Sequence, residues 1–343
     1  MNFVQENIST RKTLIWLLVL PPAVIILFLI VGVYYVTGMP GHSYSGTLSP
    51  LTEDQIEIRD RLKRHVETLA GDIGERNTVR YKELEQSASY IEEVFKDLGY
   101  RVLTQNFEAD NRVVRNIEAE ITGKTRPEEI VVIGAHYDSA RGTPGADDNA
   151  TGTASVLELA RLLKGQTLAR TVRFVLFVNE ELPFFGTEHM GSWVYARRSH
   201  ELGERIIGML SIEMTGYYSD VEGSQKYPFP FSYFYPSTGN FIAFVGNLSS
   251  RSLVRKCVAS FRNHTKFPSE GAAAPGEIKG VGWSDHWAFW QEDYQAVMIT
   301  DTAFFRYKYY HTLKDTPDKI DYTNMARVVS GLRYVILDLA DTE

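Results

Sequence analysis

The sequence predicts an α/β fold of three layers, in which a mixed, largely parallel sheet carries helices on both faces. Continuous apolar runs at 130–133, 172–178 and 206–212 are typical of strands that are buried on both faces. Helical segments at 150–163 and 187–198 separate these runs, as in strand–helix–strand units. Since 44% of the 343 residues are hydrophobic, we expect a packed core rather than disorder.

The rest of the chain supplies further elements of both kinds. Helical spacing predicts helices over 51–70, 81–98, 249–263 and 322–340. Alternating residues predict a hairpin of half-exposed strands over 101–108 and 113–121, and short apolar runs predict strands at 241–245 and 296–300. Nothing marks a boundary after residue 51, so we expect 51–343 to form one domain.

The N-terminal region is predicted to anchor the chain in a membrane. Segment 14–36 has no charged residue and is long enough to span a bilayer as a helix. Arg11 and Lys12 precede it, so the positive-inside rule places 1–13 in the cytoplasm and the later residues outside, after a Gly/Ser/Pro-rich tether at 37–50. A cleaved signal peptide is the alternative, although the run is long and lacks a small-x-small cleavage site.

Charge and cysteine content limit the kinds of partner and the cellular compartment that we expect. The net charge of −7, without a basic run, argues against nucleic-acid binding. Cys257 is the only cysteine, so the chain forms no internal disulfide, and any zinc must take histidine and carboxylate ligands. An exported domain without disulfides fits a bacterial periplasm or cell surface, with the anchor in the inner membrane.

Histidines and carboxylates follow the predicted buried strands. His136 comes after the first, the pair Glu180 and Glu181 after the second, and Glu213 after the third. Because ligands of open α/β sheets bind beyond the carboxyl ends of the strands, we expect these side chains to meet. Asp148 at a helix start and His311 near the C-terminus complete the set that two zinc ions require.

Each candidate has a purely structural alternative. Asp147 and Asp148 could cap a helix, but one cap suffices, so we assign Asp148 to bridge two metals and Asp147 to support it. The Glu180–Glu181 pair could be an exposed loop; alternatively, one glutamate binds zinc while the other moves the proton of the attacking water. The alternatives for Glu213 and His311 are a core salt bridge and packing among aromatic residues.

Other residues are expected to support the site. Asp138 could accept the second ring N–H of His136, and the Tyr310 phenol could stabilise an oxyanion. The segment Ser284–Asp285–His286 either supports the metal ligands or positions the substrate, or it is a plain loop. The aromatic segment 227–241 and the Gly/Ala-rich segment 269–282 either border a substrate cleft or pack as ordinary loops.

These motifs together resemble the co-catalytic zinc exopeptidases, a family that includes bacterial secreted double-zinc aminopeptidases, aminopeptidase Y and glutamate carboxypeptidase II. Glutaminyl cyclase and the transferrin receptor ectodomain are related to this family by fold. The matching motifs are His136-Tyr137-Asp138, the turn at 145–152, Glu180-Glu181, Ser284-Asp285-His286 and Tyr310-His311. The resemblance implies that His136, Asp148, Glu181, Glu213 and His311 bind two Zn²⁺ ions, with Glu180 as general base. The double-zinc aminopeptidases usually have aspartate where this chain has Glu213.

We therefore expect a membrane-anchored zinc metallopeptidase that hydrolyses peptides, most simply an aminopeptidase. Two alternatives remain: a glutaminyl cyclase-like acyltransferase that needs one zinc, and a non-catalytic receptor or scaffold on the same fold. Aminopeptidase versus carboxypeptidase action, side-chain preference and oligomeric state are left open by the sequence.

Overall fold

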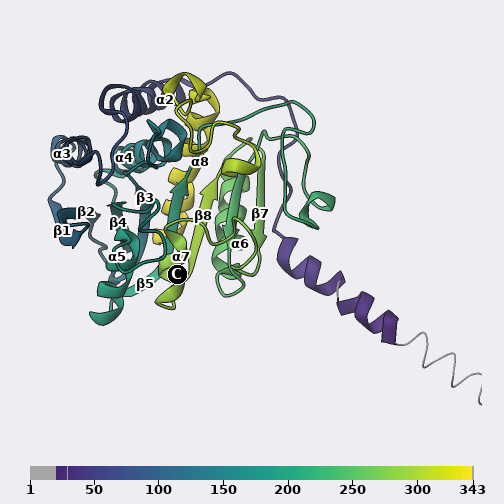
Figure 1. Cartoon of the computed structure of the whole chain (residues 1–343). Helices are drawn as coiled ribbons and strands as arrows, with labels where there is room; N and C mark the ends of the chain where they lie inside the picture. Colours follow the sequence, from purple (N-terminus) through teal and green to yellow (C-terminus); the bar gives the residue numbers. More distant parts are fainter. Residues whose placement is uncertain (1–20, 29, 342–343) are drawn as a thin grey trace, which may run out of the picture. The chain divides into compact units, whose positions relative to one another are not determined.

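The computed structural model describes residues 21–28 and 30–341 (Figure 1). The chain divides into two compact units, Met1–Gly38 and Met39–Glu343. In the first unit, residues 21–28 and 30–37 are helical. Within the described ranges, no helix is both long and apolar enough to cross a membrane. Part of the predicted span 14–36 lies outside these ranges, so the membrane anchor stays a prediction.

One eight-stranded sheet forms the centre of the second unit, in the order β1-β2-β4-β3-β5-β8-β6-β7. Its strands are β1 Val102–Ala109, β2 Arg112–Ile121, β3 Arg126–His136, β4 Arg170–Phe177, β5 Arg205–Glu213, β6 Ile242–Gly246, β7 Ser269–Ala273 and β8 Ala296–Thr300. The β4-β3-β5-β8 block is parallel throughout, and β7 runs parallel to β6. The pairs β1-β2, β2-β4 and β6-β8 are antiparallel. The sheet is therefore mixed and largely parallel, as predicted.

Helices cover both faces of this sheet (Figure 1). The α-helices are α2 Glu53–Val66, α3 Tyr81–Asp97, α4 Gly152–Leu163, α5 Gly191–Glu201, α6 Arg251–His264, α7 His286–Gln291 and α8 Tyr322–Asp341. Alternate residues of β3 enter two separate cores: Val131 and Ile133 pack with the α2, α4, α6 and α8 residues, while Ile130 and Val132 pack with α5 and α7 residues. This alternation follows from the period of two of a strand, and it confirms the three-layer α/β prediction.

Two elements were missed from the sequence. The segment 269–282 was expected to be a loop, but its first five residues form the edge strand β7. These residues, SEGAA, include no β-branched or aromatic side chain, so pairing with β6 rather than local propensity makes the strand. The six-residue helix α7 is too short to show a helical period. The helix expected at 187–198 begins later, at Gly191, because turns occupy the residues before it.

Candidate metal centre

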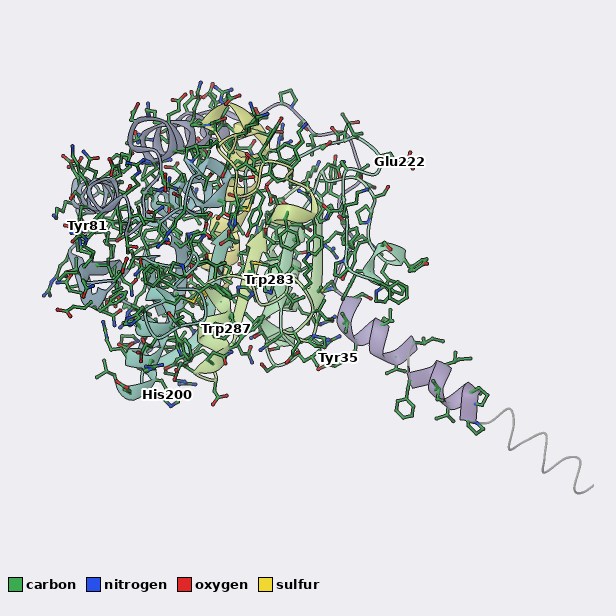
Figure 2. The ribbon with its side chains drawn as sticks, in the orientation of Figure 1. Tyr35, Tyr81, His200, Glu222, Trp283 and Trp287 are labelled. Atoms are coloured by element: carbon green, nitrogen blue, oxygen red, sulfur yellow. The ribbon has the colours of Figure 1, made fainter. Side chains whose placement is uncertain are left out.

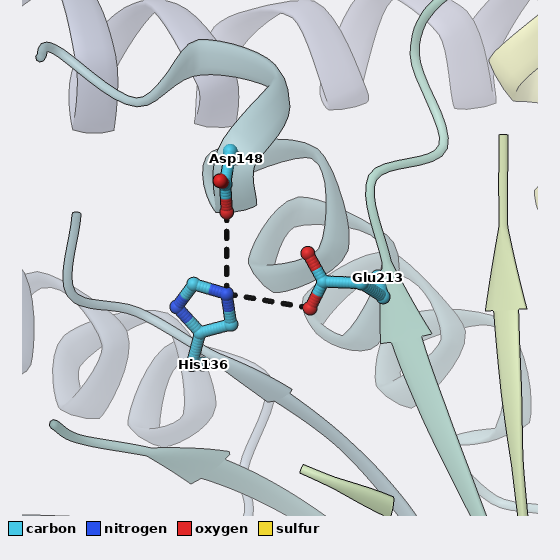
Figure 3. A group of neighbouring side chains, drawn as sticks. All are labelled: His136, Asp148 and Glu213. Carbon is cyan, nitrogen blue, oxygen red and sulfur yellow. Dashed lines mark ion pairs between the residues drawn. The ribbon is translucent and has the colours of Figure 1, made fainter. Parts of the chain in front are cut away.

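Three of the predicted ligands converge at the carboxyl ends of β3 and β5 (Figure 3). His136 ends β3, Glu213 ends β5, and Asp148 comes from the irregular turn Ala146–Thr151 that leads into α4. The Nε2 atom of His136 lies 3.4 Å from Asp148 Oδ1 and 3.3 Å from Glu213 Oε2. Ligand bonds of about 2.0–2.1 Å at tetrahedral angles place neighbouring ligand atoms roughly 3.3 Å apart, so this spacing suits one zinc ion.

A second group shares Asp148 with the first. The Nε2 atom of His311 lies 3.0 Å from Asp148 Oδ2 and 3.2 Å from Glu181 Oε2. Each group has its ligand atoms within 4.8 Å of one another. One oxygen of Asp148 therefore faces the His136 group and the other faces the His311 group, which is the arrangement of a carboxylate that bridges two cations.

The burial and charge of these residues favour bound cations. Among the described residues, both ring nitrogens of His136 and Oε1 of Glu181 are buried without a hydrogen-bond partner. Burial, with the neighbouring Asp148 carboxylate, raises the pKa of Glu181 to about 7 although His311 opposes the shift. Burial alone would lower the pKa of His311, but its contacts with Asp148 and Glu181 raise it to about 10. Oxygen and imidazole ligands crowded in a mostly buried site suit divalent zinc, because the metal offsets the repulsion between the carboxylates.

Glu180 lies beside the first group without belonging to either. Its Oε2 atom is 3.8 Å from His136 Nε2, and the side chain is buried. Burial raises the pKa of Glu180 well above its ordinary value; His136 opposes this shift, while Glu181 and Glu213 add to it. A carboxylate that is adjacent to a metal position but not needed as a ligand is free to accept a proton from a bound water.

Asp138 contacts both the turn that carries Glu180 and Glu181 and the imidazole of His136. Its carboxylate accepts the backbone N–H groups of Glu180 at 3.1 Å and Glu181 at 3.2 Å, which holds the turn that carries both glutamates. Its Oδ1 atom also approaches Nδ1 of His136 at 3.5 Å. The sequence suggested only the approach to the imidazole; the contact with the glutamate turn joins residues 42 and 43 positions apart, and no local pattern reveals it.

Two further residues that fix Asp148 and Glu213 were missed. The Asp315 carboxylate accepts the backbone N–H groups of Asp147 at 2.8 Å and Asp148 at 3.2 Å. The Asn149 amide donates to Glu213 Oε2 at 3.2 Å, and its oxygen accepts the N–H of Met214 at 3.1 Å. Only their closeness in sequence to predicted ligands could have pointed to them. Asp315 follows His311 by four residues, and Asn149 follows Asp148 directly.

The remaining candidates differ in how they relate to the two ligand groups. Ser284 donates to Glu213 Oε2 at 2.7 Å, and Asp147 Oδ1 accepts the N–H of Gly216 at 2.9 Å. Asp285 is fully buried, and burial raises its pKa to about 7. His286 points elsewhere: its Nε2 atom lies 2.7 Å from the carbonyl oxygen of Val281. Tyr310 stacks on the His311 ring with centroids 3.8 Å apart.

An apolar pocket adjoins the first metal group. Its volume is about 120 Å³, and both Glu213 and Tyr310 line it. The floor is one face of three strands, formed by Ala243 and Val245 of β6, Glu270 and Ala272 of β7, and Met298 and Thr300 of β8. Aromatic side chains form the walls: Tyr227, Phe231, Tyr235, Phe241, Trp283, Phe304 and Phe305. Trp283 is labelled in Figure 2. The aromatic segment thus borders the site, one of the two options left by the sequence.

Arg76 organises the loop between His136 and Asp148 from a fully buried position. Its guanidinium donates to the carbonyl oxygens of Tyr137 (2.7 Å), Pro144 (2.6 Å), Gly145 (2.8 Å) and Gly74 (3.1 Å). Burial lowers the pKa of Arg76 to about 10, against the opposing effect of Asp138 and other carboxylates, so it stays charged at neutral pH. The sequence offered no sign of this role.

We expect Arg76→Met to lower the free energy of unfolding by about 3 kcal/mol or more, because several buried carbonyls lose their donor. The urea midpoint measures this change. Arg80→Met is the matched control: Arg80 is largely exposed and 3.7 Å from Glu75, so we expect a change within about 0.5 kcal/mol. Equal midpoints for the two variants would show that the loop does not depend on Arg76.

His286 provides a pH test of folding stability. Burial lowers the pKa of His286 to about 4, while the unfolded chain titrates near 6.5. Between these values the unfolded state binds the proton and the folded state does not, so acidification from pH 6.5 to 4 costs up to about 3 kcal/mol. In His286→Gln this contribution is absent. Unfolding curves at several pH values should therefore show a smaller loss of unfolding free energy on acidification. Parallel losses in both proteins would contradict a neutral buried imidazole.

Comparison with known proteins identifies the family. Residues 116–336 match the model of peptidase family M28. The chain belongs to this family. Membership confirms the predicted resemblance, and with it the prediction of a zinc metallopeptidase. The M28 match covers the strands from β3 to β8 and all five predicted ligands, so the family assignment and the converging side chains concern the same part of the molecule.

This M28 chain is similar to individual proteins from bacteria and yeast. It is 40% identical over 282 residues to the uncharacterized protein YfbL of Escherichia coli, covering 80% of this chain and 86% of YfbL. It is 26% identical to the probable aminopeptidase YDR415C of Saccharomyces cerevisiae, covering 76% of this chain and 66% of that protein. The zinc aminopeptidase BSAP of Bacillus subtilis has the same fold, with a TM-score of 0.67 at 16% identity over 83% of this chain and 95% of BSAP.

Proposed function

We propose that this M28 peptidase is an aminopeptidase that uses two zinc ions and the general base Glu180. The observation that carries the proposal is the pair of ligand groups that share Asp148, with one carboxylate oxygen turned to each group. His136 and Glu213 would hold one ion, and Glu181 and His311 the other. The name of the yeast relative, a probable aminopeptidase, agrees with this reading.

The bound zinc would supply a water of lowered pKa and an electrophile for the peptide carbonyl. The residues of the chain then perform the proton chemistry. Glu180 accepts the proton of the attacking water, since it is close to His136 but outside both ligand groups. It later returns the proton to the leaving nitrogen. Tyr310, fixed by its stacking on His311, donates to the oxyanion as the carbonyl becomes tetrahedral.

The charge of the site favours a free α-amine over an α-carboxylate as the substrate terminus. Glu180 and Asp285 are buried acids outside the ligand groups, and Glu213 lines the apolar pocket. An ammonium group is attracted by such carboxylates, whereas a terminal carboxylate is repelled. This argument supports aminopeptidase rather than carboxypeptidase action.

The pocket beside Glu213 would bind the side chain of the N-terminal residue. Its aromatic walls and small floor residues favour bulky apolar side chains. We expect Ala243→Leu, which fills the floor, to lower kcat/KM for leucine and phenylalanine para-nitroanilides by about tenfold or more. Alanine para-nitroanilide should be affected much less. A uniform loss for all three substrates would place the substrate side chain elsewhere.

A peptide panel tests the activity itself. The same peptide with a free N-terminus, a blocked N-terminus and a blocked C-terminus should be cleaved only when the amine is free. Cleavage that requires a free C-terminus would indicate a carboxypeptidase. Cyclisation of an N-terminal glutamine without hydrolysis would indicate the acyltransferase alternative, and no turnover with zinc bound would indicate a receptor or scaffold.

We also propose that the enzyme is a single-pass membrane protein with its catalytic unit outside the cytoplasm of a bacterium. The support is the uncharged segment 14–36 with Arg11 and Lys12 before it. Carbonate extraction of membranes tests the anchor, and protease accessibility in spheroplasts tests the orientation. Release of the full-length chain by carbonate would exclude an integral anchor.

A further inference from the structure

One loop of the catalytic unit exposes an unusual group of aromatic side chains. Residues 227–236 read YPFPFSYFYP, and no acidic, basic or histidine residue occurs from 227 to 250. We call 227–236 the aromatic loop. Phe229 is 83% exposed, Tyr233 77% and Phe234 47%. Large aromatic side chains are seldom left in water as a group, so such a cluster marks an interaction surface.

Ring stacking on the inner side of the aromatic loop holds the side chains on its outer side in place. Tyr227 and Tyr235 stack with ring centroids 5.8 Å apart, and Phe231 stacks on Tyr235 at 6.1 Å. These three rings line the apolar pocket. On the outer side Phe229 and Tyr233 meet edge to face at 6.2 Å. The loop therefore has one aromatic layer that faces the pocket and another that faces solvent.

The start of the catalytic unit lies beside this loop. The Tyr235 hydroxyl donates to the carbonyl oxygen of Gly271 in β7 at 2.7 Å. Met39 packs closely on the same glycine. A Cβ atom at position 271 would lie 2.9 Å from the Cγ atom of Met39. Arg262 secures the following residues by donating to the carbonyl oxygens of Pro40 at 2.9 Å and Gly41 at 3.2 Å.

Only a short link of chain joins the proposed anchor to the start of the catalytic unit. The N-terminal helical segment reaches residue 37, two residues before Met39. Two residues span at most about 7 Å, so the end of that segment is held near Met39 whatever direction the helix takes. If the segment spans a bilayer, the outer face of that bilayer lies within a short distance of Tyr235 and its neighbours.

We propose that Phe229, Tyr233 and Phe234 insert into the interface of the lipid bilayer next to the anchor. The proposal rests on the anchor proposed above. Aromatic residues favour the headgroup region of membranes, where an apolar ring and polar groups are both accommodated. The absence of charge across 227–250 removes the desolvation cost that acidic or basic side chains would bring. The pocket, whose wall is the inner layer of the same loop, then lies close to the membrane surface.

A fluorescent probe at position 229 tests the contact in the full-length chain. Cys257 is the only native cysteine and is fully buried, so an environment-sensitive dye attaches to Phe229→Cys alone. The labelled protein is reconstituted in vesicles of phosphatidylethanolamine and phosphatidylglycerol, with or without nitroxide-labelled lipid. We expect a blue shift of the dye and loss of most of its fluorescence with the nitroxide lipid.

Leu103→Cys provides the matched control. Leu103 is also apolar and 44% exposed, but it lies on β1, at the opposite edge of the sheet from β7. Its probe should keep its fluorescence with the nitroxide lipid. Tyr233→Cys repeats the measurement on the same surface if Phe229→Cys folds poorly, and the proposal requires quenching there too.

The outcomes separate the two proposals. If the chain floats with the vesicles but the probes at 229 and 103 respond alike, the anchor holds and the aromatic surface is not a membrane contact; a protein partner is then the better explanation. If the chain does not float with the vesicles, the anchor proposal fails, and the inference about the aromatic loop fails with it.

Discussion

Glu180→Gln should lower kcat by about 10²–10⁴-fold, the usual contribution of a general base. The amide keeps the size of the side chain but accepts a proton poorly, so both the attack of water and the protonation of the leaving nitrogen become slow. Since Glu180 lies outside both ligand groups, we expect the zinc content to stay at the wild-type value. Steady-state kinetics and elemental analysis of the same preparation measure the two quantities.

Glu188→Gln is the control for the Glu180 experiment, because Glu188 is an exposed glutamate eight residues further on. It should leave both kcat and zinc content unchanged. An unchanged rate in Glu180→Gln would remove Glu180 from the mechanism. A lost rate together with lost zinc would instead indicate that Glu180 acts as a ligand.

Asp148→Ala should remove bound metal from both groups, because Asp148 is the one residue common to them. We expect wild-type protein to carry about two zinc ions per chain, the number that a bridged site holds. Glu213→Ala should keep about one, since Asp148, Glu181 and His311 remain in place. Elemental analysis after dialysis against metal-free buffer gives the stoichiometry, and activity should be lost in Asp148→Ala.

Ser211→Ala serves as a comparison for Glu213→Ala, because Ser211 is a buried polar residue of the same strand outside both ligand groups. Its zinc content should equal that of the wild type. If Asp148→Ala and Glu213→Ala lose the same amount of metal, the bridge does not exist. If wild-type protein binds one ion at saturation, the site resembles the single-zinc alternative and the two-ion mechanism is wrong.

Local patterns in the sequence were sufficient for seven of the eight strands in the described sheet and for most helices. Strand β5 was visible because Ile206 to Ile212 form an apolar run, and α3 because its period and Gly99 mark both its course and its end. Strand β7 was not visible, since its small residues carry no strand signal and only pairing with β6 orders them. Predictions of this kind succeed where burial leaves a periodic trace in neighbouring residues.

By itself, the sequence determined the family and the kinds of ligand, because ordered motifs such as His136-Tyr137-Asp138 and Tyr310-His311 are read directly from the chain. Only the tertiary structure decided how the groups meet. The contact of Asp315 with the Asp148 N–H joins residues 167 positions apart, and the pocket floor combines one face of three strands. Such arrangements depend on strand order and side-chain direction across the sheet, which short-range patterns do not encode.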